Sequence, residues 1–174
     1  MKIISLVPVG QVERDHLELL SEQLASRLGA ACLIQPQRQN GEFAYNRDRG
    51  QYHSTEILKR LLQDPHTESW RILGVTNLDL YIPILTFVFG EAQLGAAAAL
   101  VSTHRLRPEF YGMPQDPELL QERLLKEALH ELGHTFGLRH CSDYLCVMSS
   151  SHSAERIDLK QAEFCPACTA VAGL

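Results

Sequence analysis

The chain contains one stretch that decides how it folds, His130-Glu131-Leu132-Gly133-His134-Thr135-Phe136-Gly137-Leu138-Arg139-His140. On an α-helix, His130 and His134 lie about 40° apart around the axis and about 6 Å apart along it. Both imidazoles can therefore reach one metal ion at about 2.0–2.1 Å. Glu131 lies about 100° around the helix from His130, where it can hydrogen-bond a metal-bound water without ligating the metal. The spacing predicts a metal site carried on a helix.

Gly137 explains how a third histidine can join this site. If the helix continued, His140 would lie about 15 Å further along the axis than His130. Glycine adopts the left-handed conformation at little cost and commonly ends a helix, so the chain can turn there and bring His140 back. Ordinary residue usage would produce the whole pattern by chance in far fewer than about 1% of chains of this length.

Composition narrows the class of protein. The 174 residues suffice for one domain with a substantial core, and 45% hydrophobic and 21% charged residues are typical of a globular protein. The net charge of −5 argues against nucleic acid as the main partner. No apolar run reaches the roughly 18 residues of a membrane span. The apolar start, Met1 to Pro8, lacks a small-x-small cleavage site and favours a strand over a signal peptide. We expect a single-domain, cytoplasmic monomer without a membrane partner.

Four of the five cysteines form two close pairs, Cys141 with Cys146 and Cys165 with Cys168. The odd count and the clustering disfavour a disulfide framework. The pairs predict a tetrahedral Cys₄ zinc site, which has no open position and is therefore structural. It would tie the loop after the helix to the C-terminus. Cys32 lies in an apolar run and is expected to be a buried small hydrophobe. The alternative, an inhibitory thiolate on the catalytic metal, is set aside because Cys32 belongs to the folded core.

The remaining pattern predicts an α/β (α+β) fold with a mixed five-stranded sheet that has one antiparallel member. Residues 36–53 are expected to form a long loop or hairpin, and residues 104–115 a turn-rich loop. Residues 96–103 fit a strand or a short helix, and we choose a strand because it completes the sheet. Ser54 and Thr55 are candidate caps of one helix, and Asp116 with Pro117 begins another. The expected strands are 2–8, 30–34, 70–78, 85–89 and 96–103, and the expected helices are 11–28, 54–64 and 116–136.

The motifs from His130 to Cys168 resemble those of the archaemetzincins, a metzincin family of zinc peptidases. The histidine stretch is followed directly by C-x₄-C-x-M, at Cys141 to Met148, and later by C-x-x-C. The resemblance implies a compact metalloprotease domain over residues 1–174, with a twisted sheet packed on helices and a C-terminal tail bound to the Cys₄ zinc. It also implies an upper subdomain at 1–137 and a lower subdomain at 138–174. In such enzymes an antiparallel edge strand lines the cleft and binds extended peptide, and Leu85 to Phe89 is our candidate.

The resemblance also implies residue roles and a cofactor content of two zinc ions per chain. Glu131 would be general base and then general acid, and Met148 would be the methionine of the Met-turn beneath the zinc. Ser150 stands where some metzincins carry a tyrosine that approaches the metal, so no such fifth ligand is expected. His152 is expected to be a solvated loop residue rather than a substrate contact. The catalytic zinc would be held by His130, His134 and His140, and the structural zinc by Cys141, Cys146, Cys165 and Cys168.

The sequence therefore predicts a zinc metallopeptidase that acts on peptide or protein substrates. The main alternative is a non-hydrolytic zinc protein that binds peptides in the cleft, although simple binding would not require Glu131. A nucleic-acid-binding zinc ribbon is disfavoured, because residues 141–174 carry two basic residues against four acidic ones, Asp143, Glu155, Asp158 and Glu163. Imidazole ligands also suit iron, nickel or cobalt, whereas thiolates favour zinc or iron–sulfur.

Overall fold

A five-stranded mixed sheet forms the centre of the computed structural model, which describes residues 1–37, 39–64 and 69–174. The strand order is β2-β1-β5-β8-β7. The first four strands are mutually parallel, and β7 runs antiparallel to β8 at one edge. The predicted mixed sheet with one antiparallel edge strand is confirmed. Its strands are β1 (Ile3–Val9), β2 (Ala31–Ile34), β5 (Arg71–Thr76), β8 (Ala98–Ser102) and β7 (Gly90–Ala92).

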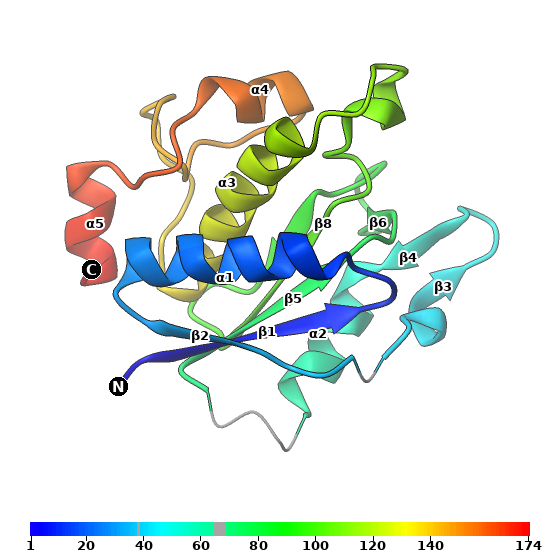
Figure 1. Ribbon diagram of the computed structural model, residues 1–174, viewed down its shortest axis with the longest axis horizontal. Helices are drawn as coiled ribbons and strands as arrows, with labels where there is room; N and C mark the ends of the chain where they lie inside the picture. Colours follow the sequence, from blue (N-terminus) through cyan, green and yellow to red (C-terminus); the bar gives the residue numbers. More distant parts are fainter. Residues whose placement is uncertain (38, 65–68) are drawn as a thin grey trace.

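Helices cover both faces of this sheet, so its central strands read as continuous apolar runs. Helices α1 (Arg14–Leu28) and α3 (Pro117–Thr135) pack on one face, and α2 (Ser54–Leu62) packs on the other (Figure 1). Strand β1 shows the alternation, because Ile4 and Leu6 join the core under α1 and α3, whereas Val7 and Val9 join the core under α2. Burial on both faces selects aliphatic residues at most positions of β1, with Ser5 and Pro8 as the exceptions.

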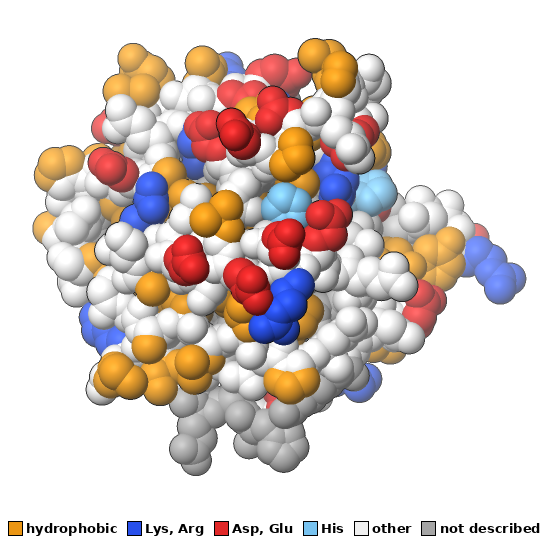
Figure 2. Space-filling view, in the orientation of Figure 1, with side chains coloured by type: hydrophobic (Ala, Val, Ile, Leu, Met, Phe, Trp, Pro, Cys, Tyr) orange, Lys and Arg blue, Asp and Glu red, His pale blue; other side chains and the backbone are white. Residues whose placement is uncertain are grey.

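Helix α1 is amphipathic, with one stripe in the core and one in solvent. Its buried stripe is leucine, and its outer face carries the exposed acids Asp15, Glu18 and Glu22. Figure 2 shows acidic side chains gathered over this part of the surface, with basic side chains scattered singly among them. This face therefore lacks the continuous positive charge that a nucleic-acid surface needs. The buried stripe is Leu17, Leu20, Leu24 and Leu28.

A second, three-stranded sheet was not predicted. The region expected to be a loop or hairpin contains η1 (Glu42–Ala44) and an antiparallel pair, β3 (Tyr45–Asn46) and β4 (Gln51–His53). Strand β4 pairs in parallel with β6 (Leu80–Tyr81). These strands are two or three residues long, too short for hydrophobic periodicity to reveal.

The prediction of an edge strand at Leu85 to Phe89 is wrong. Those residues form a rim loop, and the antiparallel strand β7 begins at Gly90. The carbonyls of Leu85 and Thr86 accept hydrogen bonds from the Arg49 guanidinium at 2.6 and 3.3 Å, and Thr86 also accepts one from the Gln51 amide at 3.0 Å. Side chains of the β3–β4 region thus occupy acceptors that a strand would offer to its neighbour.

Helix α2 does not use its expected caps. His53 occupies the N-cap position without a side-chain hydrogen bond. The Ser54 and Thr55 hydroxyls instead donate to the carboxylate of Glu91, which lies on β7. These bonds tie the edge strand to the helix beneath it.

Helix α3 begins as predicted. The Asp116 carboxylate accepts a hydrogen bond from the Leu119 backbone N–H at 2.9 Å, and Pro117 takes the first helical position. From Leu120 to Gly133 nearly every residue is buried against β7, β8 and α1. A helix packed on so many sides holds its side chains in fixed positions.

The chain after α3 contains two short helices that were not predicted, α4 (Ala154–Leu159) and α5 (Pro166–Ala172). Helix α4 lies against α3 (Figure 1). The loop before α3 includes one 3₁₀ turn, η2 (Pro108–Tyr111). Within the described part of the chain, no helix combines the length and apolar character needed to cross a membrane.

Met148 packs beneath α3 at a point where only glycine fits. Its side chain is fully buried, and a Cβ added at Gly133 would collide with the Met148 sulfur and meet Phe164 Cε1 at 3.0 Å. Gly133 lies one residue before His134, so this contact fixes the helix where the histidines project.

We therefore predict that Gly133→Ala destabilises the protein, although the same change in an open helix stabilises it by about 1 kcal/mol. Overpacking of a filled core costs about 1–3 kcal/mol, so the melting temperature should fall by several degrees. Thermal unfolding by circular dichroism measures this change. A higher melting temperature for Gly133→Ala would mean that Met148 does not fill the space beneath the helix.

Candidate metal centre and active-site cleft

Three imidazoles converge at the C-terminal end of α3. His130 and His134 lie in its last two turns, and the helix ends at Thr135. Gly137 then takes a left-handed conformation, with φ of 89°, and the chain turns back as predicted. His140 returns so that its ring centroid lies 5.3 Å from that of His130 and 5.1 Å from that of His134. One ring nitrogen of each histidine lies within 4.8 Å of the others.

The hydrogen bonds of two of these histidines fix which nitrogen faces the centre. His130 Nδ1 lies 2.9 Å from the Val147 carbonyl, and His134 Nδ1 lies 2.8 Å from the Leu138 carbonyl. A carbonyl only accepts, so both Nδ1 atoms carry the proton and both Nε2 atoms carry a lone pair. Burial lowers the pKa of His130 well below its usual 6.5, which keeps that ring neutral.

The two Nε2 atoms face one another 3.2 Å apart. Two lone pairs at that distance repel, and a cation between them turns the repulsion into attraction. Nitrogens that bind a tetrahedral zinc at about 2.0–2.1 Å are about 3.3 Å apart, so the donor set fits zinc. The carbonyls behind the rings are the partners that metal-binding histidines usually have.

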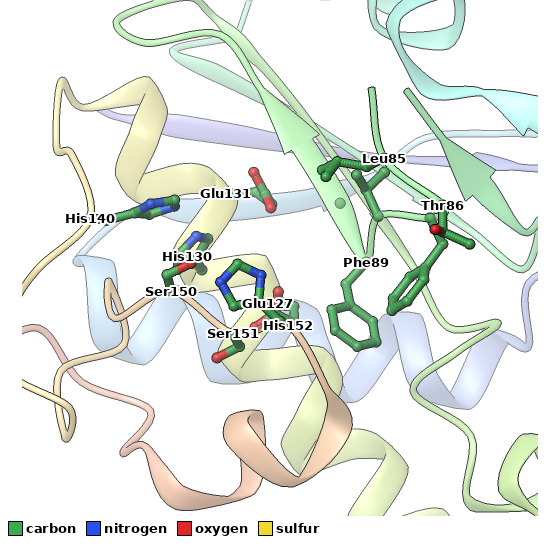
Figure 3. Close-up of a pocket in the computed structure, with 13 residues that line it drawn as sticks. Leu85, Thr86, Phe89, Glu127, His130, Glu131, His140, Ser150, Ser151 and His152 are labelled. Carbon is green, nitrogen blue, oxygen red and sulfur yellow. The ribbon is translucent and has the colours of Figure 1, made fainter. Parts of the chain in front are cut away.

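Glu131 faces the same space from α3. It is 6% exposed, and in Figure 3 its carboxylate lies between α3 and strand β7. Burial raises the pKa of Glu131 well above its usual 4.5, the Glu127 and Glu91 carboxylates raise it further, and Lys160 opposes them. A carboxylate in this setting accepts a proton readily.

Gly90 allows Glu131 to take that place. A Cβ at this position would lie 2.5 Å from the Leu100 carbonyl oxygen, 2.8 Å from Glu131 Cγ and 3.0 Å from Glu131 Oε1. The edge strand therefore approaches the glutamate too closely to carry any side chain there. Sequence analysis did not identify Gly90, because its role depends on a contact across the sheet.

A cleft of about 320 Å³ opens beside the histidines (Figure 3). The rim loop and β7 form one wall, and the segment after Met148 forms the other. His152, predicted to be a solvated loop residue, is exposed and lines this cleft together with Ser150. The lining residues are Leu85, Thr86, Phe87, Val88, Phe89, Gly90, Glu127, His130, Glu131, His140, Ser150, Ser151 and His152.

The four clustered cysteines also come together. Their sulfur atoms lie within 4.8 Å of one another, and the Sγ atoms of Cys141 and Cys165 are 3.8 Å apart. That distance is too long for a disulfide and equals the roughly 3.8 Å between thiolates on a tetrahedral zinc. The backbone N–H groups of Met148 and Cys165 point at the Cys146 sulfur, at 3.4 and 3.3 Å, as they do toward thiolates.

Cys32 lies apart from both clusters, on strand β2. It is half-buried against the core, and burial raises the pKa of its thiol to about 11. A thiol with that pKa is a poor metal ligand at neutral pH. Cys32 therefore packs against the core as expected, but it is half-buried rather than fully buried.

Comparison with known proteins assigns the chain to a family. The sequence profile described as Peptidase family M54 matches residues 18–172. The archaemetzincin of Methanocaldococcus jannaschii is 46% identical over 165 residues, which cover 95% of this chain and 89% of that protein. The archaemetzincin of Pyrococcus furiosus is 42% identical over 172 residues, which cover 95% of this chain and 90% of that protein.

Solved structures show the same fold. The crystal structure of archaemetzincin from Methanopyrus kandleri matches with a TM-score of 0.87 and 38% identity, covering 99% of this chain and 93% of that one. The archaemetzincin from Archaeoglobus fulgidus, crystallised with malonate, gives a TM-score of 0.85 and 37% identity, covering 97% of this chain and 99% of that one. The extent and identity of these matches show that the chain belongs to peptidase family M54, the archaemetzincins.

Proposed function

We propose that the protein is a zinc-dependent metallopeptidase in which His130, His134 and His140 hold the catalytic zinc. The convergence of three lone-pair nitrogens beside a buried carboxylate, in one cleft, is the observation that carries this proposal. A relative of the same fold supports it. The structure from Methanocorpusculum labreanum, described as a zinc-dependent peptidase, matches with a TM-score of 0.87 and 30% identity, covering 97% of this chain and 99% of that one.

Glu131 is the proposed general base and then general acid. Bound zinc supplies Lewis acidity, which polarises the scissile carbonyl and makes a water molecule more acidic. The Glu131 carboxylate takes a proton from the attacking water and later gives it to the leaving amine. Its burial suits this task, because a raised pKa lets the carboxyl group hold the proton between the two steps.

The free edge of β7 supports a peptide substrate. The Phe89 carbonyl accepts a hydrogen bond from Ser102 on β8, so by strand alternation the peptide groups of Gly90 and Ala92 face away from β8. An extended peptide can pair with these outward-facing groups as an added strand. Such pairing would place its backbone along the cleft, next to Glu131.

We infer a second, structural zinc held by Cys141, Cys146, Cys165 and Cys168. Four sulfur ligands complete a tetrahedral site and leave no position for substrate. Cys141 directly follows His140, and Cys146 lies two residues before Met148. This site would therefore hold the third histidine and the floor of the catalytic site in place.

Glu131→Gln is predicted to lower kcat by about 10²–10⁴-fold, because the amide is nearly isosteric and cannot take the proton. Zinc content, measured by elemental analysis, should stay at the parent value. Glu118→Gln provides the matched control, since Glu118 is exposed in the first turn of the same helix. Digestion of a peptide library, with and without chelator, identifies a substrate for these assays.

Two results would contradict the proposed chemistry. A Glu131→Gln variant that cleaves at the parent rate would show that another group moves the proton. Saturable peptide binding without any zinc-dependent cleavage by the parent protein would favour the peptide-binding module instead.

Gly90→Ala is predicted to reduce kcat at least about tenfold while both metal sites remain filled. The added methyl group must displace Glu131 or the edge strand, and small displacements of a catalytic group can cost about 10²-fold. Ala92→Gly, two residues along the same strand, is the control for a general weakening of the edge. Equal losses in the two variants would mean that the approach of Gly90 to Glu131 has no special role.

Mutations should distinguish the roles of the two metal sites. We expect His140→Ala to lose one zinc and peptidase activity, with only a small fall in melting temperature. Cys165→Ser should also lose one zinc, together with a large fall in melting temperature, because a structural zinc contributes folding free energy directly. Zinc analysis and thermal unfolding of both variants test this. Equal effects of the two variants on stability would refute the division into a catalytic and a structural site.

A further inference from the structure

A buried ion pair beside the cleft takes no direct part in the proton transfer proposed above, although both of its charges act on Glu131. Lys160 Nζ lies 3.0 Å from Glu127 Oε1 and donates a hydrogen bond to the Ser149 carbonyl at 3.1 Å. The side chains of Lys160 and Glu127 are 1% and 5% exposed. Lys160 itself follows the end of α4. One ammonium group thus joins three segments of the chain.

One partner of Lys160 lines the cleft, and the other directly precedes the residues of the opposite wall. Glu127 lies on α3 one turn before Glu131, and its side chain lines the cleft (Figure 3). Ser149 directly follows Met148 and precedes Ser150, Ser151 and His152, which line the opposite wall. The ammonium group therefore links the helix that carries the proposed base to the wall across from it.

Stability alone is a weak explanation for this pair. Removing two charges from water costs several kcal/mol per ion, and well-packed apolar residues are often as stable as a buried ion pair. Within the described chain, the buried Glu127 Oε1 atom has no hydrogen-bond partner, so its contact with Lys160 Nζ is one of charge. What the pair does supply is a fixed spacing between two segments.

We propose that Lys160 is a positioning residue of the substrate cleft, which sets the spacing between helix α3 and the wall formed by residues 150–152 through its bond to Ser149. This inference rests on the proposed function, since it assumes that a peptide lies between these walls. The side chain of the substrate residue next to the cleaved bond would occupy the space that Lys160 keeps open. Its loss should weaken peptide binding and leave the histidines in place, because no hydrogen bond or ion pair among the described residues joins Lys160 to them, although its charge acts on His130 and His140.

Two zinc-binding probes separate these effects without any turnover. Acetohydroxamate reaches only the metal, whereas a peptide that carries a hydroxamate group at one end also fills the cleft. Calorimetry on the zinc-loaded protein gives both affinities. For Lys160→Met we expect the acetohydroxamate affinity to stay within about threefold of the parent, and the peptidyl hydroxamate affinity to fall at least about tenfold.

Lys126→Met is the matched control. Lys126, like Lys160, is a buried lysine, and it lies on α3. Its ammonium group pairs with Glu122 at 2.5 Å and donates a hydrogen bond to the Asp158 carbonyl on α4 at 3.3 Å. Among the described residues, its partners Glu122 and Asp158 do not line the cleft, whereas the Lys160 partner Glu127 does. Its loss should lower the melting temperature as the loss of Lys160 does, yet leave both hydroxamate affinities near those of the parent.

The double variant Lys160→Met with Glu127→Gln separates the effect on cleft spacing from the effect on protein stability. It leaves no unpaired buried charge, so the melting temperature should recover relative to Lys160→Met alone. The peptidyl hydroxamate affinity should not recover, because the tether to Ser149 is still missing. Recovery of affinity together with stability would overturn the proposal.

Three other outcomes would also overturn it. In the first, Lys160→Met binds the peptidyl hydroxamate within about threefold of the parent affinity. In the second, Lys160→Met loses affinity equally for both hydroxamates. In the third, the parent protein binds the two hydroxamates equally well. The proposed function fails in a different way. A zinc-loaded parent that shows the expected split between probes but cleaves no peptide would refute hydrolysis and leave the positioning role intact.

Discussion

The structure depends on two imidazole nitrogens that face one another 3.2 Å apart, each with its lone pair pointing inward. Backbone carbonyls of Val147 and Leu138 fix both rings in that orientation, so the repulsion is built into the fold. A cation relieves it, and the rest of the fold holds the nitrogens ready to bind one. Helix α3 is buried along most of its length, which keeps the two rings in register.

The four-cysteine cluster lies next to His140, the one histidine of the site that helix α3 does not carry. His140 is exposed and follows the turn at Gly137, so it has little packing of its own. Cys141 comes next in the chain, and a metal ion held by the four cysteines would tie that point to the C-terminal segment. Met148 lies between the cluster and the helix, packed against Gly133. The two sites are thus structurally coupled, because a metal ion in the cysteine site would restrict the position of His140.

Sequence patterns predicted the parts of this construction that are local. The i, i+4 histidines, the turn at Gly137 and the cap at Asp116 depend on neighbours a few residues away, and the structure has each of them. The edge strand was placed about five residues too early, because an apolar run looks like a strand whether or not its carbonyls are free. Arg49 occupies those carbonyls from a distant segment. Gly90, Glu127 and Lys160 escaped notice for the same reason, since each acts through a contact that only the folded chain creates.

The central claim is that one ion has three nitrogen ligands and an open side, while a second ion is enclosed by sulfur. An anomalous difference map, recorded at the zinc absorption edge from crystals grown with zinc, tests it most directly. The account predicts two peaks per chain, one bound by His130, His134 and His140 and facing the cleft, the other surrounded by the four cysteine sulfurs. A single peak, or a histidine-bound ion whose remaining position is filled by another side chain of the protein, would contradict it.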